Sequence, residues 1–174
     1  MTFDSIFSEY QKMVFNLALH YVQQVEDAEE IAQDVFVKIY QKLDEFKHES
    51  NLKTWIYRIT INQSLDFIKA KQSQKRKVFQ RMFSWNDVPT KQYPVNNYHP
   101  GVMLEQKEDY DQLFNTLNSL PNNQKTVLIL LKIEQKSQKE TAEIMGLNIK
   151  ALESLFQRAK NNLEIKLNQN KGKI

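Results

Sequence analysis

The chain has 174 residues, of which 41% are hydrophobic, and its 24 Lys and Arg against 21 Asp and Glu give a formal net charge of +3. This length fits one domain or two small ones, and the absence of cysteine excludes disulfides, thiolate nucleophiles and cysteine-ligated zinc. No apolar segment approaches the ~20 residues that a bilayer requires, and the N-terminus lacks a signal-peptide pattern, so we expect a cytoplasmic protein with no membrane insertion of its own.

Three helices are predicted in the N-terminal half. Apolar residues recur every three or four positions over 4–22, 27–43 and 52–71, and the last segment extends toward residue 83. Asp27 and Glu30 have the spacing of a capping box at the start of the second helix. The face of the first helix that we expect in the core consists of Phe7, Tyr10, Val14, Leu17, Ala18 and Tyr21.

The second helix has two rows of residues that contain apolar side chains, instead of the single apolar stripe of most surface helices. Its core face begins at Ala28 and Ile31, and a second stripe follows a different row. A surface helix normally has one apolar stripe, so the second predicts a docking face for another protein. Burial of this stripe under the first helix or the linker is an equally good interpretation. The second stripe consists of Gln33, Val37, Tyr40 and Gln41, with Phe36 at its edge and Asp34 beside it.

The third helix has a row that changes from apolar to polar. Trp55, Ile59, Asn62 and Asp66 follow one another at spacings of four, three and four. An amide and a carboxylate at the end of an aromatic row can hydrogen-bond base edges, and exposed aromatics such as Tyr57 or Phe46 could stack on unpaired bases. Cations that follow could neutralise phosphates, although a solvated lysine-rich helix end, with Asn62 and Asp66 merely exposed, is the simpler interpretation of this helix alone. These cations are Lys69, Lys71, Lys75, Arg76, Lys77 and Arg81.

A linker and a second helical unit follow. Pro89, Pro94 and Pro100 fall within residues 84–101, which predicts a linker. Helices are expected over 104–117, 122–134, 137–145 and 148–167, followed by a polar tail. The predicted fold is therefore all-α, with two small helical bundles at residues 1–83 and 102–168, a flexible linker at 84–101 and a tail at 169–174.

Residues 137–160 have the layout of a helix-turn-helix, in which the second helix enters the DNA major groove. Gly146 can adopt a positive φ and end the first helix, and Asn148 can cap the next one. Many helical hairpins share this pattern, so it does not by itself identify a DNA-binding protein.

No feature indicates an enzyme. Glu26, Glu30 and Asp34 repeat every four residues, but no histidine stands near them as a metal-binding helix bundle would need. Glycine-rich phosphate loops and nucleophile elbows are also absent from the sequence. We expect no catalytic residue, no metal and no cofactor.

Taken together, these segments resemble the extracytoplasmic-function sigma factors of bacterial RNA polymerase. DAEEIAQDVFVKIYQKL at 27–43 is similar to the family's core-polymerase-binding helix, and TWIYRITINQSLDFIKAK at 54–71 is similar to its promoter −10 helix. In the second unit, Leu117, Leu120, Pro121 and Lys125 follow the family's LxxLPxxxR/K pattern. Many relatives have a basic residue at the position of Glu153 and an Arg at that of Leu155, so individual DNA contacts there are in doubt.

The resemblance implies a protein that binds core RNA polymerase, through the β′ clamp coiled coil and the β flap, binds promoter DNA, and is held by an anti-sigma factor. The implied polymerase contacts are Gln33, Asp34, Phe36, Val37, Tyr40 and Gln41. The implied −10 contacts are Phe46, Lys47, His48, Asn51, Lys53, Trp55, Arg58, Asn62, Asp66, Lys69 and Lys71. The implied −35 contacts are Lys125, Ser137, Lys139, Asn148, Lys150, Ala151, Glu153, Ser154, Gln157, Arg158 and Lys160.

Two other functions compete with this interpretation. A stand-alone helix-turn-helix regulator would bind duplex DNA tightly as a dimer, although the sequence has no heptad seam for dimerisation. A helical adaptor would bind only proteins, and the cations from Lys69 to Arg81 would then be incidental.

Overall fold

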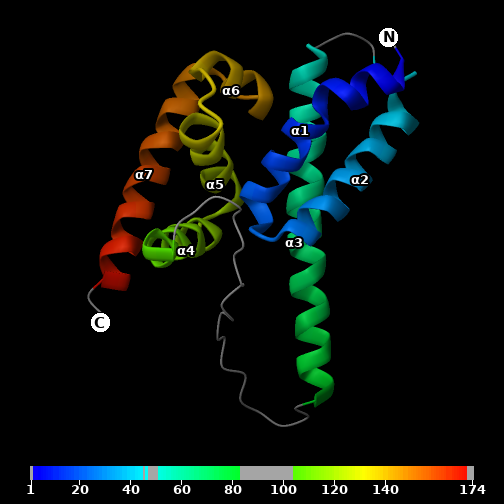
Figure 1. Ribbon diagram of the computed structural model, residues 1–174. Coiled ribbons are helices and arrows are strands. Elements are labelled where there is room, and N and C mark those ends of the chain that lie inside the picture. The colour runs from blue at the N-terminus through cyan, green and yellow to red at the C-terminus, as the bar shows by residue number, and fades with distance from the viewer. Residues whose placement is uncertain (1, 45, 47–50, 83–103, 172–174) are drawn as a thin grey trace.

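The computed structural model describes residues 2–44, 46, 51–82 and 104–171, and this part of the chain is helical throughout except for short turns. Figure 1 shows two groups of helices, which confirms the predicted all-α fold with two bundles. The predicted linker at 84–101 lies outside the described residues. The elements are α1 (Phe3–Val22), α2 (Val25–Lys42), α3 (Leu52–Met82), α4 (Leu104–Asn118), α5 (Asn122–Leu128), the π-helical turn η1 (Ile129–Ile133), α6 (Gln138–Met145) and α7 (Ile149–Lys171).

The N-terminal bundle consists of α1, α2 and α3, each of which contacts the other two. Its core contains the inward stripes that the sequence predicts: Val14 and Leu17 of α1, Ile31 of α2 and Ile56 of α3 are at most 1% exposed. Phe7 is an exception, because it is 41% exposed instead of lying in the core. The predicted face of the first helix is therefore wrong at its N-terminal end.

The start of α2 differs from the prediction. The helix begins at Val25, and its N-cap residue Gln24 makes no side-chain capping bond. The predicted capping box of Asp27 and Glu30 is therefore wrong, because Asp27 already lies inside the first turn. Its carboxylate accepts a hydrogen bond from the ammonium of Lys71 in α3, and this ion pair ties the two helices together.

The C-terminal bundle consists of α4, α5, η1, α6 and α7. Phe114, Val127, Leu152 and Ala159 form its core and are at most 2% exposed. The last helix continues through Lys171, so the predicted helix end at residue 167 is wrong, and the first residues of the predicted polar tail at 169–174 belong to the helix.

One regular helix was expected over residues 122–134, but the structure has a π-helical turn in it. The backbone N–H of Glu134 donates to the carbonyl of Ile129 over 2.9 Å, a bond that spans five residues. Gln135 then adopts a φ of 51°, which turns the chain out of the helix. Such π-helical turns are rare and occur mostly as single turns within α-helices, and this one immediately precedes Glu134.

The turn between α6 and α7 forms as predicted. Gly146 has a φ of 65° and ends α6, and its N–H bonds back to the carbonyls of Ala142 and Glu143. The Asn148 carboxamide accepts from the backbone N–H of Ala151 over 2.8 Å, which confirms it as the cap of α7. At the other end of α6, Ser137 and Glu140 form a reciprocal capping box.

Replacing Gly146 with alanine tests the conformational demand at this turn. No atom lies within 4 Å of a Cβ built there, so the cost comes only from the positive φ. We expect Gly146→Ala to lower the free energy of unfolding by roughly 1 kcal/mol and Gly146→Asn to lower it less, because asparagine tolerates the left-handed region better. Urea unfolding measures both. Equal losses of unfolding free energy for the two variants would contradict the conclusion that the cost comes from the positive φ.

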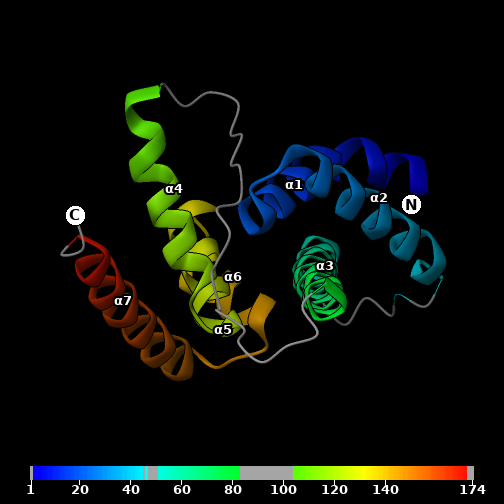
Figure 2. The same cartoon turned by 90° about the horizontal axis from the view of Figure 1, so that it is seen from below.

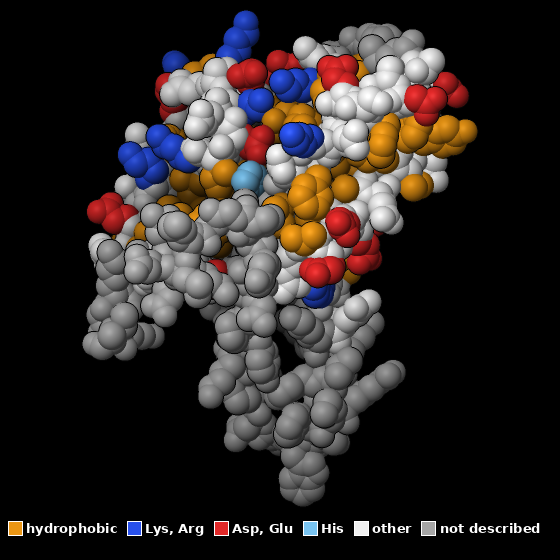
Figure 3. Space-filling model, in the orientation of Figure 1, with side chains coloured by type: hydrophobic (Ala, Val, Ile, Leu, Met, Phe, Trp, Pro, Cys, Tyr) orange, Lys and Arg blue, Asp and Glu red, His pale blue; other side chains and the backbone are white. Residues whose placement is uncertain are grey.

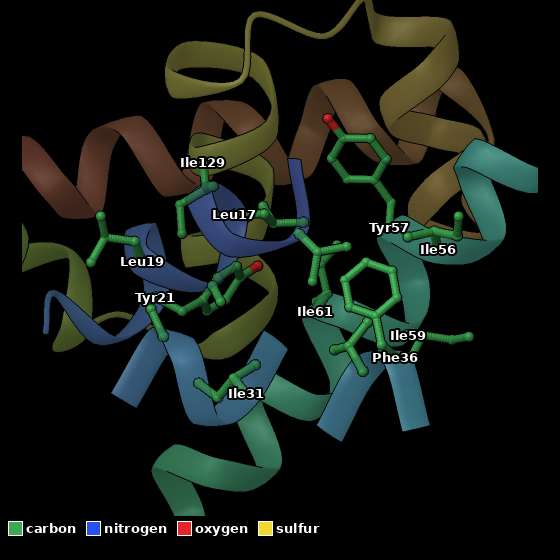
Figure 4. Packing of buried hydrophobic residues seen from close by; sticks show 14 of the residues in the cluster. Leu17, Leu19, Tyr21, Ile31, Phe36, Ile56, Tyr57, Ile59, Ile61 and Ile129 are labelled. Atoms are coloured by element: carbon green, nitrogen blue, oxygen red, sulfur yellow. The ribbon is translucent and has the colours of Figure 1, made fainter. Parts of the chain in front are cut away.

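The two bundles pack against each other. Viewed along α3, Figure 2 shows α1 and α2 on one side of this helix and α5 and α6 on another. Ile129, Leu130 and Ile144 of the C-terminal bundle belong to the same apolar cluster as the core of the N-terminal bundle. Figure 4 shows Ile129 of η1 beside Leu17 and Leu19 of α1.

Candidate protein and nucleic-acid interfaces

An exposed apolar surface lies on α1 and α2. Val37 and Tyr40 are 55% and 68% exposed, and Phe7 of α1 lies beside them at 41%. The Phe3 ring packs edge-on to Tyr40, with centroids 5.3 Å apart. Figure 3 shows hydrophobic side chains at the surface over α1 and α2, with acidic side chains nearby. We call Phe3, Phe7, Val37 and Tyr40 the α1–α2 apolar surface.

The structure resolves which residues of the second stripe are covered. Gln33, Asp34 and Gln41 are exposed together with Val37 and Tyr40. Phe36, in contrast, is only 6% exposed, because Phe3 and Phe7 pack on it with ring centroids 6.3 and 4.8 Å away. The first helix therefore covers one edge of the stripe and leaves the rest open. The sequence prediction missed Phe3 and Phe7, although both are large apolar residues near the start of α1.

The row of residues predicted on α3 changes from buried apolar to exposed polar side chains, as expected. Ile59 is buried, whereas Asn62 and Asp66 are exposed one and two turns further along the helix. Trp55 is half-buried, and its ring lies 5.0 Å from that of Phe46, the one described residue in this part of the loop before α3. Trp55, Asn62 and Asp66 thus lie on one row of α3, with Phe46 of the preceding loop beside Trp55, and we call these three residues of α3 the α3 strip.

Two α3 residues are placed differently from expectation. Tyr57, expected as an exposed stacking residue, is 2% exposed, and its hydroxyl donates to Glu134 over 2.9 Å. Burial, with the Glu134 charge next in size, raises the pKa of Tyr57 far above its ordinary value. Arg58 is half-buried and donates to the carbonyls of Ile144 and Glu143 over 3.1 and 2.6 Å. Both side chains therefore face the C-terminal bundle.

The remaining predicted −10 residues are only partly described. Asn51 and Lys53 are exposed, and the Asn51 carboxamide caps α3 by accepting from the Lys53 N–H over 3.0 Å. Lys69 is exposed, and Lys71 is paired with Asp27. Lys47 and His48 lie outside the described residues, as do the side chains of Lys75, Arg76, Lys77 and Arg81.

The outer face of α7 presents a polar surface. Leu152, Leu155 and Ala159 face the core, which leaves the opposite side of the helix in solvent. The exposed set contains nearly all predicted −35 residues of this segment: Ser137, Lys139, Asn148, Lys150, Glu153, Ser154, Gln157, Arg158 and Lys160, with Ala151 half-buried at the edge. Ser137 and Asn148 act as helix caps, and the other side chains form the outer face of a helix-turn-helix.

Lys125 lies away from this surface. It is 3% exposed, and its ammonium donates to the Tyr21 carbonyl over 3.1 Å and to the Asn118 side chain over 2.6 Å. The ammonium also lies 4.8 Å from the centroid of the Tyr21 ring. The structure thus places Lys125 in the contact between the bundles, not among the residues available to DNA.

The burial of Lys125 predicts a measurable pH dependence. Burial lowers its pKa from 10.5 to about 8, so between these values the unfolded chain binds this proton and the folded chain does not. Stability then rises with pH across that interval, by roughly 3 kcal/mol at most for this group. We expect urea unfolding from pH 8 to 10.5 to show this rise relative to Lys125→Met. If the stabilities of wild type and Lys125→Met changed with pH in the same way, the lowered pKa of Lys125 would be contradicted.

Comparisons with known proteins agree with this geometry. Residues 6–74 match Sigma-70 region 2, and residues 110–163 match Sigma-70 region 4. The first match includes Phe7, Val37 and Tyr40 of the α1–α2 apolar surface and the α3 strip, and the second spans the helix-turn-helix. In the described part of the chain, no helix is long and apolar enough to cross a membrane.

Relatives and solved structures match this chain over nearly its full length. The chain is 28% identical to the ECF RNA polymerase sigma-E factor of Haemophilus influenzae, over 95% of this chain and 87% of the relative. It is 24% identical to the RNA polymerase sigma-H factor of Pseudomonas aeruginosa, over 91% and 82%. The sigma factor RpoE of Bartonella quintana, solved with the anti-sigma factor NepR, is similar with a TM-score of 0.62 and 25% identity over 95% of this chain and 96% of that one. The chain therefore belongs to the sigma-70 family of RNA polymerase sigma factors, in the extracytoplasmic-function group.

Proposed function

We propose that the chain binds core RNA polymerase through the α1–α2 apolar surface together with Gln33, Asp34 and Gln41. The supporting observation is that Val37 and Tyr40 remain 55% and 68% exposed although α1 packs beside them. Exposed aromatic and aliphatic side chains with a polar rim are typical of protein interfaces, where a few such anchors supply most of the affinity. The partner surface is the β′ clamp coiled coil, and the C-terminal bundle contacts the β flap.

Promoter recognition is divided between α3 and α7. The strip of Trp55, Asn62 and Asp66 contacts the melted −10 element, with Phe46 beside it, and the exposed cation Lys69 contacts the backbone. The outer face of α7 enters the major groove of the −35 element, where Gln157 and Arg158 have the donor and acceptor groups to contact base edges. The chain supplies recognition in the cytoplasm, and the polymerase performs the bond chemistry.

Regulation by an anti-sigma factor belongs to the same proposal. The relative RpoE of Bartonella quintana was solved with the anti-sigma factor NepR. An inhibitor that covers both the α1–α2 apolar surface and the α3 strip would block polymerase and promoter together.

A binding comparison separates this function from that of a stand-alone helix-turn-helix regulator. We expect the chain alone to bind duplex promoter DNA weakly and the complex with core polymerase to bind it specifically. Electrophoretic mobility shift with and without core polymerase measures both. Tight, specific binding of duplex DNA by the chain alone, with no change on adding polymerase, would favour the regulator and overturn this proposal.

A further inference from the structure

The contact between the two bundles contains buried polar groups that are hydrogen-bonded across it. The hydroxyls of Tyr21 and Thr126 are 2.8 Å apart, and both residues are at most 5% exposed. The buried ammonium of Lys125 donates to the Tyr21 carbonyl. A buried polar group destabilises the fold unless it is hydrogen-bonded, so these groups favour one relative placement of the bundles.

Glu134 forms a second polar centre of this contact. Its carboxylate accepts from the Tyr57 hydroxyl of α3 over 2.9 Å and lies 3.2 Å from Nε2 of His20 in α1. Burial opposes the charge on Glu134, but the hydrogen bonds from His20 and Tyr57 lower its pKa below the ordinary value. Glu134 immediately follows the π-helical turn η1.

Apolar burial accompanies these bonds. Ile129 and Leu130 of η1 are fully buried, and Ile144 of α6 is 6% exposed, all within the apolar cluster of the N-terminal bundle. Separating the bundles would expose these side chains to water, which is unfavourable in proportion to their area. The packed arrangement, which we call the closed arrangement, is therefore supported by both apolar and polar contacts.

The closed arrangement occupies residues of α3 that lie next to the α3 strip. Arg58 donates to the carbonyls of Glu143 and Ile144 near the C-terminal end of α6, where a helix has unpaired carbonyls and a partial negative charge. Thr54 donates to the Glu143 carboxylate over 3.2 Å. Asn62 lines a cleft of about 450 Å³ whose other wall includes Asn123 and Gly146.

The outer face of α7 is not involved in this contact. Glu153, Ser154, Gln157 and Arg158 are all exposed while the bundles are packed together. Closure thus affects the two proposed DNA-binding surfaces unequally, because α6 covers residues of α3 and nothing in the described part of the chain covers these four residues of α7.

We propose that the C-terminal bundle is an intramolecular inhibitor of the −10 surface. In the free chain it binds Arg58 and forms the opposite wall of the cleft that Asn62 lines, so a single DNA strand has to compete with α6 for the Arg58 guanidinium. The −35 surface remains accessible in the closed arrangement. This inference rests on the proposed function, since it concerns the same α3 surface.

The first experiment measures the placement of the bundles. Because the chain has no cysteine, spin labels attached at Glu29→Cys and Glu164→Cys report one distance between α2 and α7. We expect a single narrow distance distribution in the free chain and a longer, broader one when Thr126→Val and Glu134→Ala are added. A broad distribution in the free wild-type background would overturn the closed arrangement.

The second experiment measures inhibition with two probes. Fluorescence anisotropy follows binding of a labelled pool of single-stranded oligonucleotides and of a labelled pool of duplexes, both of mixed sequence. Apparent affinity scales with the fraction of the competent state, so Thr126→Val with Glu134→Ala is expected to bind the single strands at least about tenfold more tightly. Duplex affinity is expected to stay unchanged, as is single-strand affinity in the control Gln11→Ala with Asn168→Ala. Equal single-strand affinity of the double variant and wild type would contradict the inhibition.

Two further measurements distinguish a failure of the proposed inhibition from a failure of the proposed function. Tyr57→Phe removes one hydroxyl bond to Glu134 and keeps the ring, so it is expected to raise single-strand affinity several-fold even if the double variant folds poorly. Transcription with core polymerase is expected from wild type and Tyr57→Phe alike. Transcription by both with identical single-strand affinities would overturn only the inhibition, whereas no transcription by either would count against the proposed function.

Discussion

Val37→Glu combined with Tyr40→Ala is expected to weaken binding to core RNA polymerase by a factor of the order of 100 or more. The two side chains are 55% and 68% exposed and form the centre of the α1–α2 apolar surface. Central anchors of this kind contribute about 2 kcal/mol or more each when truncated, and a buried carboxylate without a partner adds a further cost. Biolayer interferometry on immobilised core polymerase measures the change.

The matched control is Ile165→Glu, because Ile165 of α7 is 54% exposed and lies on the other bundle. It introduces the same charge at a similar exposure and is expected to leave affinity for the isolated β′ clamp coiled coil within about twofold of wild type, because the C-terminal bundle is proposed to contact the β flap instead. Circular dichroism and urea unfolding check that both variants fold. If Val37→Glu with Tyr40→Ala kept wild-type affinity, the assignment of this surface would be wrong.

Arg158→Ala is expected to lower transcription from promoters with the preferred −35 element by roughly 5- to 100-fold, since one good base contact discriminates by about 1–3 kcal/mol. Arg158 is exposed on the outer face of α7, the face that is proposed to enter the major groove. The loss should be largest for the preferred sequence and small for promoters altered in the −35 element. Multi-round transcription on a set of −35 variants measures this difference.

Two further substitutions in α7 serve as comparisons for Arg158→Ala. Lys150→Ala tests a phosphate contact, and Glu164→Ala tests a position outside the proposed DNA-binding surface. Lys150 is exposed near the start of α7, and its removal should weaken all −35 sequences by a similar factor and reduce the salt dependence of binding. Glu164 is exposed further along α7 and should have no effect. A uniform loss for Arg158→Ala across all −35 sequences would show that this side chain contacts the backbone.

The local structure of the helix-turn-helix could be predicted because single residues determine it. Gly146 adopts the left-handed conformation that other residues rarely adopt, and Asn148 caps α7 as its residue type suggests. The periodicity of α1, α2 and α3 likewise identifies most of the buried faces. These features depend on neighbours within a few positions, which a sequence displays directly.

Features that depend on distant partners could not be predicted in this way. Lys125 follows a recognisable pattern, but its burial depends on Tyr21, which lies in the other bundle. Tyr57 is expected from the sequence to be exposed, but it is buried and donates to Glu134 of the other bundle. Phe7 is expected in the core but is exposed, and Phe36 is expected at the edge of the second stripe but is buried, because α1 lies across the edge of α2. In each case periodicity identifies a face of the helix but not what packs against it.

Run-off transcription by core RNA polymerase from a library of promoter sequences tests the central claim most directly. With the chain added, transcripts are expected to start from a subset of the library whose members share two separated sequence elements, one duplex and one in the melted region. Arg158→Ala should alter the preference for the upstream element alone, and substitution of Asn62 should alter the downstream element alone. Absence of any specific start site on adding the chain would contradict its function as a sigma factor.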